Sequence, residues 1–484
     1  MHAPGNVFSM HEGNGMKRIA AFLYVWLLIG SAGVGWASAQ PVGDTLRFDL
    51  EGAVSRALEV SPEVGAVAAD RAYAEARSRL ARASRYLTEF EMTSIHAPGP
   101  GLKNLDGTPT DRLYLNPDVR NDWSRLRPFT RVEVELLQPI YTWGELGGNI
   151  RAARAGVAVE AAAVREKEVE VALRTGELYY NVLLAEALFR VAEEAEDVLA
   201  KAKQEIEKLL DEGSEDVDEA DRFQILITEQ EFERRKVEVM QKRLTARTAL
   251  ARQLFLREGA VLVPEDAALT PLAFTLDSLD VYVATALARR PELSRAAAGV
   301  AARQALVDVA RSDYYPKLFL GASFKFSAIE GRYRQRNPYV SDPFLSRGLQ
   351  AGLGIRQKLN FAQTRARVEQ ARAQRDEVRY QAESARQLIR FEVEDAYRNV
   401  LIARSALDAR REALRLSKEW LRTEQINFDL DIGDVDNLIK AVQTKLELEA
   451  ARYEAVRQYN VAVLRLLRAA GILTTTLESG TLVD

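Results

Sequence analysis

Residues 131–157 read RVEVELLQPIYTWGELGGNIRAARAGV, and the periodicity of this stretch changes halfway along it. Val132, Val134 and Leu136 alternate with Glu133 and Glu135, which is the pattern of a strand with one apolar and one polar face. After the paired glycines the chain becomes rich in alanine and charged residues, as in a helix. The stretch therefore predicts a two-faced strand that leads directly into a helix.

The chain contains an internal duplication. Residues 50–90 align without a gap on residues 279–319, so that Pro62-Glu63 falls on Pro291-Glu292 and Tyr86 on Tyr315. Because the matches keep a fixed order and a near-constant offset, they indicate two structural repeats rather than chance similarity between alanine-rich helices. Each repeat is predicted to contain a helix, two strands, a very long helix and a return helix.

The long helices are predicted at about 145–211 and 362–431, and the return helices at about 219–258 and 438–469. Neither Gly nor Pro occurs between Lys358 and Ile432, so this helix should be continuous and ~100 Å long. Apolar residues repeat in it every seven positions, from Val393 to Phe428, which predicts supercoiled packing against neighbouring helices. The return helix has apolar residues along two seams, so it should pack on two sides, in a bundle or in the wall of a tube.

Four strands are predicted, two in each repeat. In the second repeat they are KLFLGASFKFS (317–327) and LQAGLGIRQ (349–357), and in the first repeat a segment near 90–95 precedes the strand at 131–137. The alternation fits either a small soluble sheet on a helical core or a membrane barrel with lipid outside and water inside. Loops rich in Gly, Pro, Asn and Asp, with aromatic residues near the strand ends, favour the barrel. Four strands cannot close a barrel, so several chains would have to combine their strands in a ring-shaped homo-oligomer.

The N-terminus has the pattern of a secretory signal. Lys17 and Arg18 precede an apolar stretch that ends in Ala37-Ser38-Ala39, which predicts cleavage after Ala39, although an uncleaved membrane anchor is the alternative. Residues 1–15 are interpreted as an extension upstream of a start at Met16. The mature protein is expected to be exported.

Composition argues against several functions. The formal net charge of -4 gives no reason to expect binding to nucleic acid. The sequence contains no cysteine and three histidines, of which His96 is interpreted as a surface residue. Phosphate-binding and dinucleotide-binding motifs do not occur. We therefore expect no catalytic residues, no cofactor and no metal, and do not expect an enzyme.

The quoted stretches resemble the outer-membrane efflux protein family, the TolC-like channels. The resemblance rests on ALARRPEL (286–293), ARSDYYPKLFLGASF (310–324), and LLQPIYTWGELGGNIRAARA (136–155) with its weaker counterpart IRQKLNFAQTRARVEQARA (355–373). Glycine-acidic turns at Gly213 and Gly433 add to it. It implies a mainly α chain with a membrane β-barrel portion, in which three protomers share a 12-stranded barrel that continues into a periplasmic α-helical coiled-coil barrel.

The resemblance also implies domains and residue roles. The predicted segments are a leader (1–39), two efflux repeats (40–270 and 271–473) and a C-terminal tail (474–484). The side chains expected to face lipid are Val132, Val134, Leu136, Leu318, Leu320, Leu353 and Ile355. Glu133, Glu135, Lys325 and Arg356 would face the lumen, and Pro139 and Pro316 would mark the junctions of strand and helix.

At the opposite end, the resemblance implies a periplasmic tip that docks an adaptor protein through the turns at Gly213 and Gly433. Acidic residues in these turns would form a ring at the aperture: Glu215, Asp216, Asp218, Asp434 and Asp436. The implied function is a passive exit duct in the outer membrane, working with a periplasmic adaptor and an inner-membrane pump in a tripartite efflux or type I secretion system. An exported, soluble coiled-coil scaffold with a small sheet remains the alternative.

Overall fold

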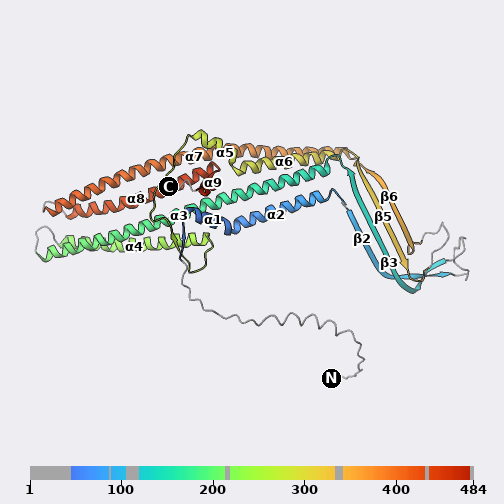
Figure 1. Ribbon diagram of the computed structural model, residues 1–484, viewed down its shortest axis with the longest axis horizontal. Coiled ribbons are helices and arrows are strands. Elements are labelled where there is room, and N and C mark those ends of the chain that lie inside the picture. Colours follow the sequence, from blue (N-terminus) through green and yellow to red (C-terminus); the bar gives the residue numbers. More distant parts are fainter. Residues whose placement is uncertain are drawn as a thin grey trace, which may run out of the picture.

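The computed structural model describes residues 45–86, 89–104, 119–212, 219–332, 342–430 and 435–479. The molecule is elongated, with a long helical body and a β-sheet at one end (Figure 1). The predicted leader, residues 1–39, lies outside the described residues, and none of the described helices has a stretch apolar and long enough to cross a membrane.

The two repeats have the same order of elements, as the duplication predicts. The first contains α1 (Leu50–Val60), α2 (Pro62–Ala83), β2 (Glu89–Asn104), β3 (Val119–Tyr141), α3 (Glu145–Asp211) and α4 (Glu219–Gln253). The second contains α5 (Leu279–Arg289), α6 (Pro291–Ser312), β5 (Lys317–Ile329), β6 (Ser346–Arg356), α7 (Phe361–Asp429) and α8 (Val435–Ala469). The long helices have 67 and 69 residues, so each is ~100 Å long. The short helix α9 (Leu473–Glu478) ends the described chain.

One small sheet was not predicted from the sequence, and two strands are longer than predicted. β1 (Thr45–Phe48) and β4 (Val261–Pro264) form a parallel pair beside the first helices. β2 extends to Asn104 and β3 begins at Val119, beyond the predicted segments at 90–95 and 131–137. His96, interpreted from the sequence as a surface residue, is exposed on β2, where its ring contacts Ser94 and Thr130.

The four long strands form one antiparallel sheet in the order β2-β3-β5-β6. The helices follow the same order near the sheet, where α2 packs on α3, α3 on α6, and α6 on α7. Farther from the sheet, α4 packs on α3, α3 on α8, and α8 on α7. Thus α7 forms one edge of the helical body, and α2 and α4 form the other.

The main core lies in the middle of the body, where α1, α3, α7 and α8 meet. The heptad residues Val393, Val400, Leu407 and Leu414 on α7 are buried, as their spacing predicts. α8 packs on both α7 and α3 and buries both of its seams near its C-terminal end, including Leu467 of one seam and Leu466 of the other.

Two glycines in the opening stretch explain the turn from β3 into α3. Gly144 has a φ of 93°, in the left-handed region that a residue without a Cβ adopts readily. A Cβ on Gly148 would lie 2.6 Å from Cγ2 of Val309, so α3 and α6 approach each other closely at this point. The sheet therefore leads directly into a tightly packed helix pair.

Candidate functional site

The antiparallel register places apolar side chains on one face of the sheet. Val134 of β3 lies opposite Met92 of β2 and Phe324 of β5, which in turn lies opposite Leu349 of β6. Leu353 and Ile355 are 79% and 71% exposed in the single chain. A soluble protein rarely exposes a continuous apolar surface of this kind, so this face needs a nonpolar partner.

The length of the apolar face fits a bilayer. It runs from the row of Leu318 and Ile355 to the row of Val132 and Phe326. This is nine residues of β5, from Leu318 to Phe326, which matches the ~9–11 residues of a tilted strand that spans the hydrocarbon core. The same face becomes polar at this end: Arg347 lies in this row, opposite Phe326, and in the next row His96 lies opposite Thr130. The seven residues predicted to face lipid all lie on this face or at its inner end, which is the end next to the helical body.

The opposite face of the sheet is charged. Lys325 lies across from Glu133, with 3.8 Å between Nζ and Oε1, and Glu135 lies opposite Glu91 of β2. The residues predicted to face the lumen therefore share one face. Arg356 is at the inner end of the face, 5.2 Å above the ring of Phe319.

Phe319 is an apolar exception on the charged face. Its ring lies across Gly354 of β6, where a Cβ would meet the Phe319 Cζ at 2.4 Å. Gly354, in AGLGIR (351–356), thus makes room for an aromatic ring on the polar side of the sheet. That packing depends on the partner strand, so the sequence of either strand alone did not reveal it.

The inner end of the sheet is held by ion pairs next to the predicted junctions. Pro316 directly precedes β5, and its carbonyl accepts a hydrogen bond of 2.6 Å from the Trp143 indole. Pro139 lies within β3, opposite Phe319, two residues before the strand ends. Asp313 accepts hydrogen bonds from Lys317 and Lys358, each at 2.9 Å. Burial raises the pKa of the Asp313 carboxyl, but the two lysines more than offset this and hold the pKa below its usual value.

Aromatic side chains gather at the same end. Trp143 stacks on Tyr315 with ring centres 4.8 Å apart and meets Tyr141 edge-on at 5.0 Å. Aromatic residues with one polar end are enriched where a membrane meets water. They stand where the apolar face of the sheet gives way to the helical body.

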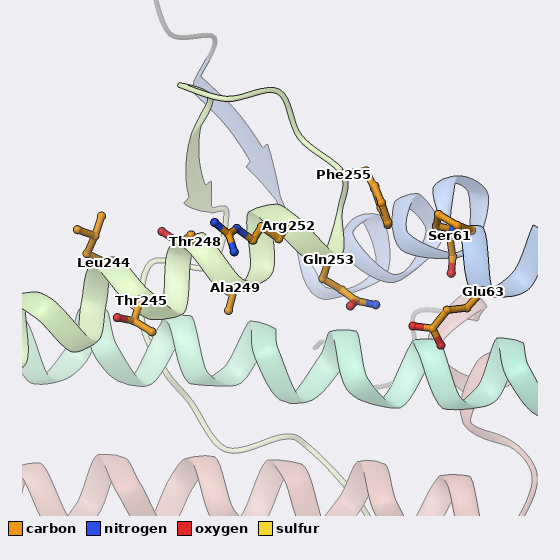
Figure 2. A pocket seen from close by; sticks show the side chains of 10 residues that line it. Ser61, Glu63, Leu244, Thr245, Thr248, Ala249, Arg252, Gln253 and Phe255 are labelled. Atoms are coloured by element: carbon orange, nitrogen blue, oxygen red, sulfur yellow. The ribbon is translucent and has the colours of Figure 1, made fainter.

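The helical body has exposed apolar surfaces on its two edges. On the α7 edge, Leu388, Phe391 and Ile402 are 57%, 61% and 66% exposed. On the other edge, an open cleft of about 760 Å³ lies between the start of α2 and the end of α4, over α3 (Figure 2). The exposed Leu244 and Phe255 line it, together with Pro62 and Glu63.

A row of ion pairs crosses the body and places these two surfaces at a similar level along the long axis. The pairs run from α2 to α7, as Glu63–Arg174, Glu177–Arg465 and Arg468–Glu392. Glu63 is held against Arg174 at 2.6 Å, and this hydrogen bond lowers the pKa of Glu63. Phe391 is next to Glu392, so it lies across the molecule from the cleft.

The predicted tip is only partly described. Of its residues, Gly213, Glu215, Asp216, Asp218, Gly433 and Asp434 lie outside the described residues. Asp436 is in the first turn of α8 and is partly buried. The ends of α3 and α7 and the starts of α4 and α8 lie together at the end of the molecule farthest from the sheet (Figure 1). Within the described residues, no group of His, Asp or Glu is arranged to hold a metal ion.

Comparison with known proteins agrees with this geometry. Residues 283–472 match the family described as Outer membrane efflux protein. The pyoverdine export outer membrane protein OpmQ of Pseudomonas aeruginosa is 30% identical over 175 residues, or 35% of this chain and 34% of that protein. The match thus spans about a third of the length of this curated relative.

Solved outer-membrane channels share the fold over most of the chain. The CmeC channel of Campylobacter jejuni is similar with a TM-score of 0.68 and 15% identity, covering 89% of each chain. The MtrE channel of Neisseria gonorrhoeae is similar with a TM-score of 0.68 and 16% identity, covering 88% of this chain and 89% of that one.

Proposed function

We propose that the chain is a member of the outer membrane efflux protein family, which its residues 283–472 match, and that it is a passive exit duct in the outer membrane, in a tripartite efflux or type I secretion system. The observation that carries the proposal is the sheet, with its exposed apolar face on one side and charged residues on the other. In the proposed duct the apolar face meets lipid and the charged face lines water, as in membrane barrels.

The open edges of the sheet support a ring of protomers. β2 and β6 are the outer strands of a four-stranded sheet, and unpaired backbone groups are not tolerated against lipid. In a ring, β6 of one protomer pairs antiparallel with β2 of the next, and three protomers provide a 12-stranded barrel. We therefore propose a homotrimer.

The helical body supports the same arrangement. Rotation about a symmetry axis along the duct does not change the height of a residue along that axis. Because Phe391 and the cleft lie at a similar height on opposite edges, the rotation brings Phe391 of one protomer towards the cleft of the next. The exposed apolar side chains on the two edges would then cover each other. The long helices would continue the barrel as a tube into the periplasm.

We further propose that the tip carries the partners. The turns at Gly213 and Gly433 would contact a periplasmic adaptor protein, and the acidic residues around them, including Asp436, would form a cation-attracting ring at the aperture. An inner-membrane pump would supply the energy. The name of the relative OpmQ describes pyoverdine export, so small molecules are the first class of substrate to test, and polypeptides the second.

Fractionation of producing cells tests the proposal. Membranes are washed in alkaline carbonate, which removes peripheral proteins, and are then separated on a density gradient. We expect the protein to remain in the outer-membrane band after the wash. Release as a soluble species would mean that the strands form an ordinary sheet, and the soluble scaffold would replace the duct.

A further inference from the structure

We propose that the segments flanking the β5–β6 loop, residues 330–332 and 342–345, fold inward as a cap that narrows the outer end of the duct. The inference rests on the proposed function, because it takes the charged face of the sheet as the lumen wall. It adds a constriction at the end farthest from the helical tip.

The first observation is that part of the charged face is covered. Phe129, Ser327 and Ile329 share this face with Glu133 and Lys325, because they lie at even spacing from them along β3 and β5. Phe129, Ser327 and Ile329 are only 8%, 3% and 4% exposed. The outer end of the lumen wall is therefore buried, although the sheet is a single layer (Figure 1).

The second observation identifies what covers it. The Pro343 carbonyl accepts hydrogen bonds from Ser327 Oγ at 3.2 Å and from Arg131 Nη2 at 3.5 Å. The Phe344 ring packs edge-on against Phe129, with ring centres 5.6 Å apart. Since β5 separates β3 from β6 in the sheet, the segment before β6 reaches β3 only by crossing the charged face.

The third observation is the anchor of the cap. All five N–H groups of the Arg332 guanidinium donate hydrogen bonds. Two go to Asp342, at 2.8 and 2.9 Å, two to the carbonyls of Pro100 and Gly101, and one to Asn121. The side chains of Arg332 and Asp342 are 3% and 10% exposed.

This anchor fixes the cap to the far side of the sheet. Arg332 and Asp342 belong to the cap, whereas Pro100 and Gly101 belong to β2 and Asn121 to β3. A buried charge whose partner is removed is strongly unfavourable, so loss of either member of the ion pair should release the cap. In a trimer, three caps directed inward would exclude large solutes from outside while leaving a narrow path.

Accessibility of single cysteines tests the proposal, because the chain has no cysteine of its own. Glu135→Cys places a thiol on the charged face, inward of the cap, and Val134→Cys places one on the apolar face beside it. Intact cells are treated with a small charged methanethiosulfonate reagent or with a polyethylene glycol maleimide too large for the outer membrane's general pores. We expect the small reagent to modify Glu135→Cys and the large reagent to leave it unmodified.

Opening the cap should admit the large reagent. Adding Arg332→Gln to Glu135→Cys should speed its reaction by roughly tenfold or more, whereas adding Arg347→Gln, an exposed arginine on the apolar face of β6, should not. If Arg332→Gln fails to assemble, Phe344→Ala uncovers Phe129 without leaving a buried charge, and the same increase is expected.

The outcomes separate the cap from the duct itself. Rapid reaction of Glu135→Cys with the large reagent in the otherwise unchanged protein would overturn the cap, as would equal rates with and without Phe344→Ala. If the small reagent modifies Val134→Cys and Glu135→Cys equally, the two faces of the sheet do not separate lipid from water. In that case the proposed function itself fails.

Discussion

Asp313 is the residue on which the inner end of the sheet depends most directly. Besides its hydrogen bonds to Lys317 and Lys358, it lies 3.5 Å from the Arg367 guanidinium. The three cations come from β5, the β6–α7 connection and α7, so one carboxylate joins the sheet to the helical body. Its side chain is 14% exposed, which limits screening by water.

Replacing this carboxylate should destabilise the protein in a pH-dependent way. We expect Asp313→Asn to lower the free energy of unfolding by ~1–3 kcal/mol at neutral pH. Because the pKa of Asp313 is lower in the folded protein, its contribution is present above the unfolded value of about 3.9 and is lost as pH falls through the folded pKa. The variant should therefore lose less stability than the wild type on acidification below about pH 4.

Urea unfolding of detergent-solubilised protein at a series of pH values measures this difference. Asp308→Asn is the matched control, since Asp308 of α6 pairs with Arg151 of α3 but its side chain is 38% exposed. Loss of this pair should cost less than about 1 kcal/mol. Parallel pH profiles for wild type and Asp313→Asn would contradict the role assigned to Asp313.

At the scale of elements, the sequence predicted the helices closely and the strands poorly. A long run of residues without Gly or Pro, with regular heptads, defines a helix almost to its ends, as the observed bounds of α7 confirm. The strand predicted near 90–95 ended too early because the proline and glycine residues at 98–101 are typical of a loop. An edge strand tolerates proline, since one row of its N–H groups needs no partner in the same chain.

The two faces of β6 give the clearest test at this scale. Leu353 is on the apolar face and Gln350 on the charged face of the same strand. We expect Leu353→Arg to destabilise the folded barrel by ~1–3 kcal/mol, because Leu353 lies between the middle of the apolar face, where a basic residue costs most, and its end. Gln350→Arg adds the same side chain to the wet face and should change stability by less than about 0.5 kcal/mol.

Reversible folding into lipid vesicles, followed by urea titration, gives both free energies. Equal losses for the two variants would show that the faces of β6 meet the same environment. The sequence predicted this division of faces from alternation alone. It did not predict the crossing of the charged face by residues 342–345, because that contact joins segments that are far apart in the chain.

For the whole molecule, the decisive feature is that each edge of the protomer is incomplete. The sheet ends in β2 on one side and β6 on the other, and the helical body ends in α2 and α4 on one side and α7 on the other. Alternation and heptads predicted that neighbours are needed. Only the folded chain shows that Phe391 and the cleft of Figure 2 lie at a similar level on opposite edges.

The final prediction tests this pairing of edges. Phe391→Asp places a carboxylate where the proposed ring buries an aromatic side chain, which should weaken each contact by roughly 2–3 kcal/mol and shift the trimer towards monomers. Arg390→Asp adds the same group at the next position, about 100° around α7, and should leave the trimer intact. Light scattering of the detergent-purified proteins gives the mass of each assembly. If Phe391→Asp remains as trimeric as Arg390→Asp, α7 does not meet a neighbour at this level, and the ring must close through other surfaces.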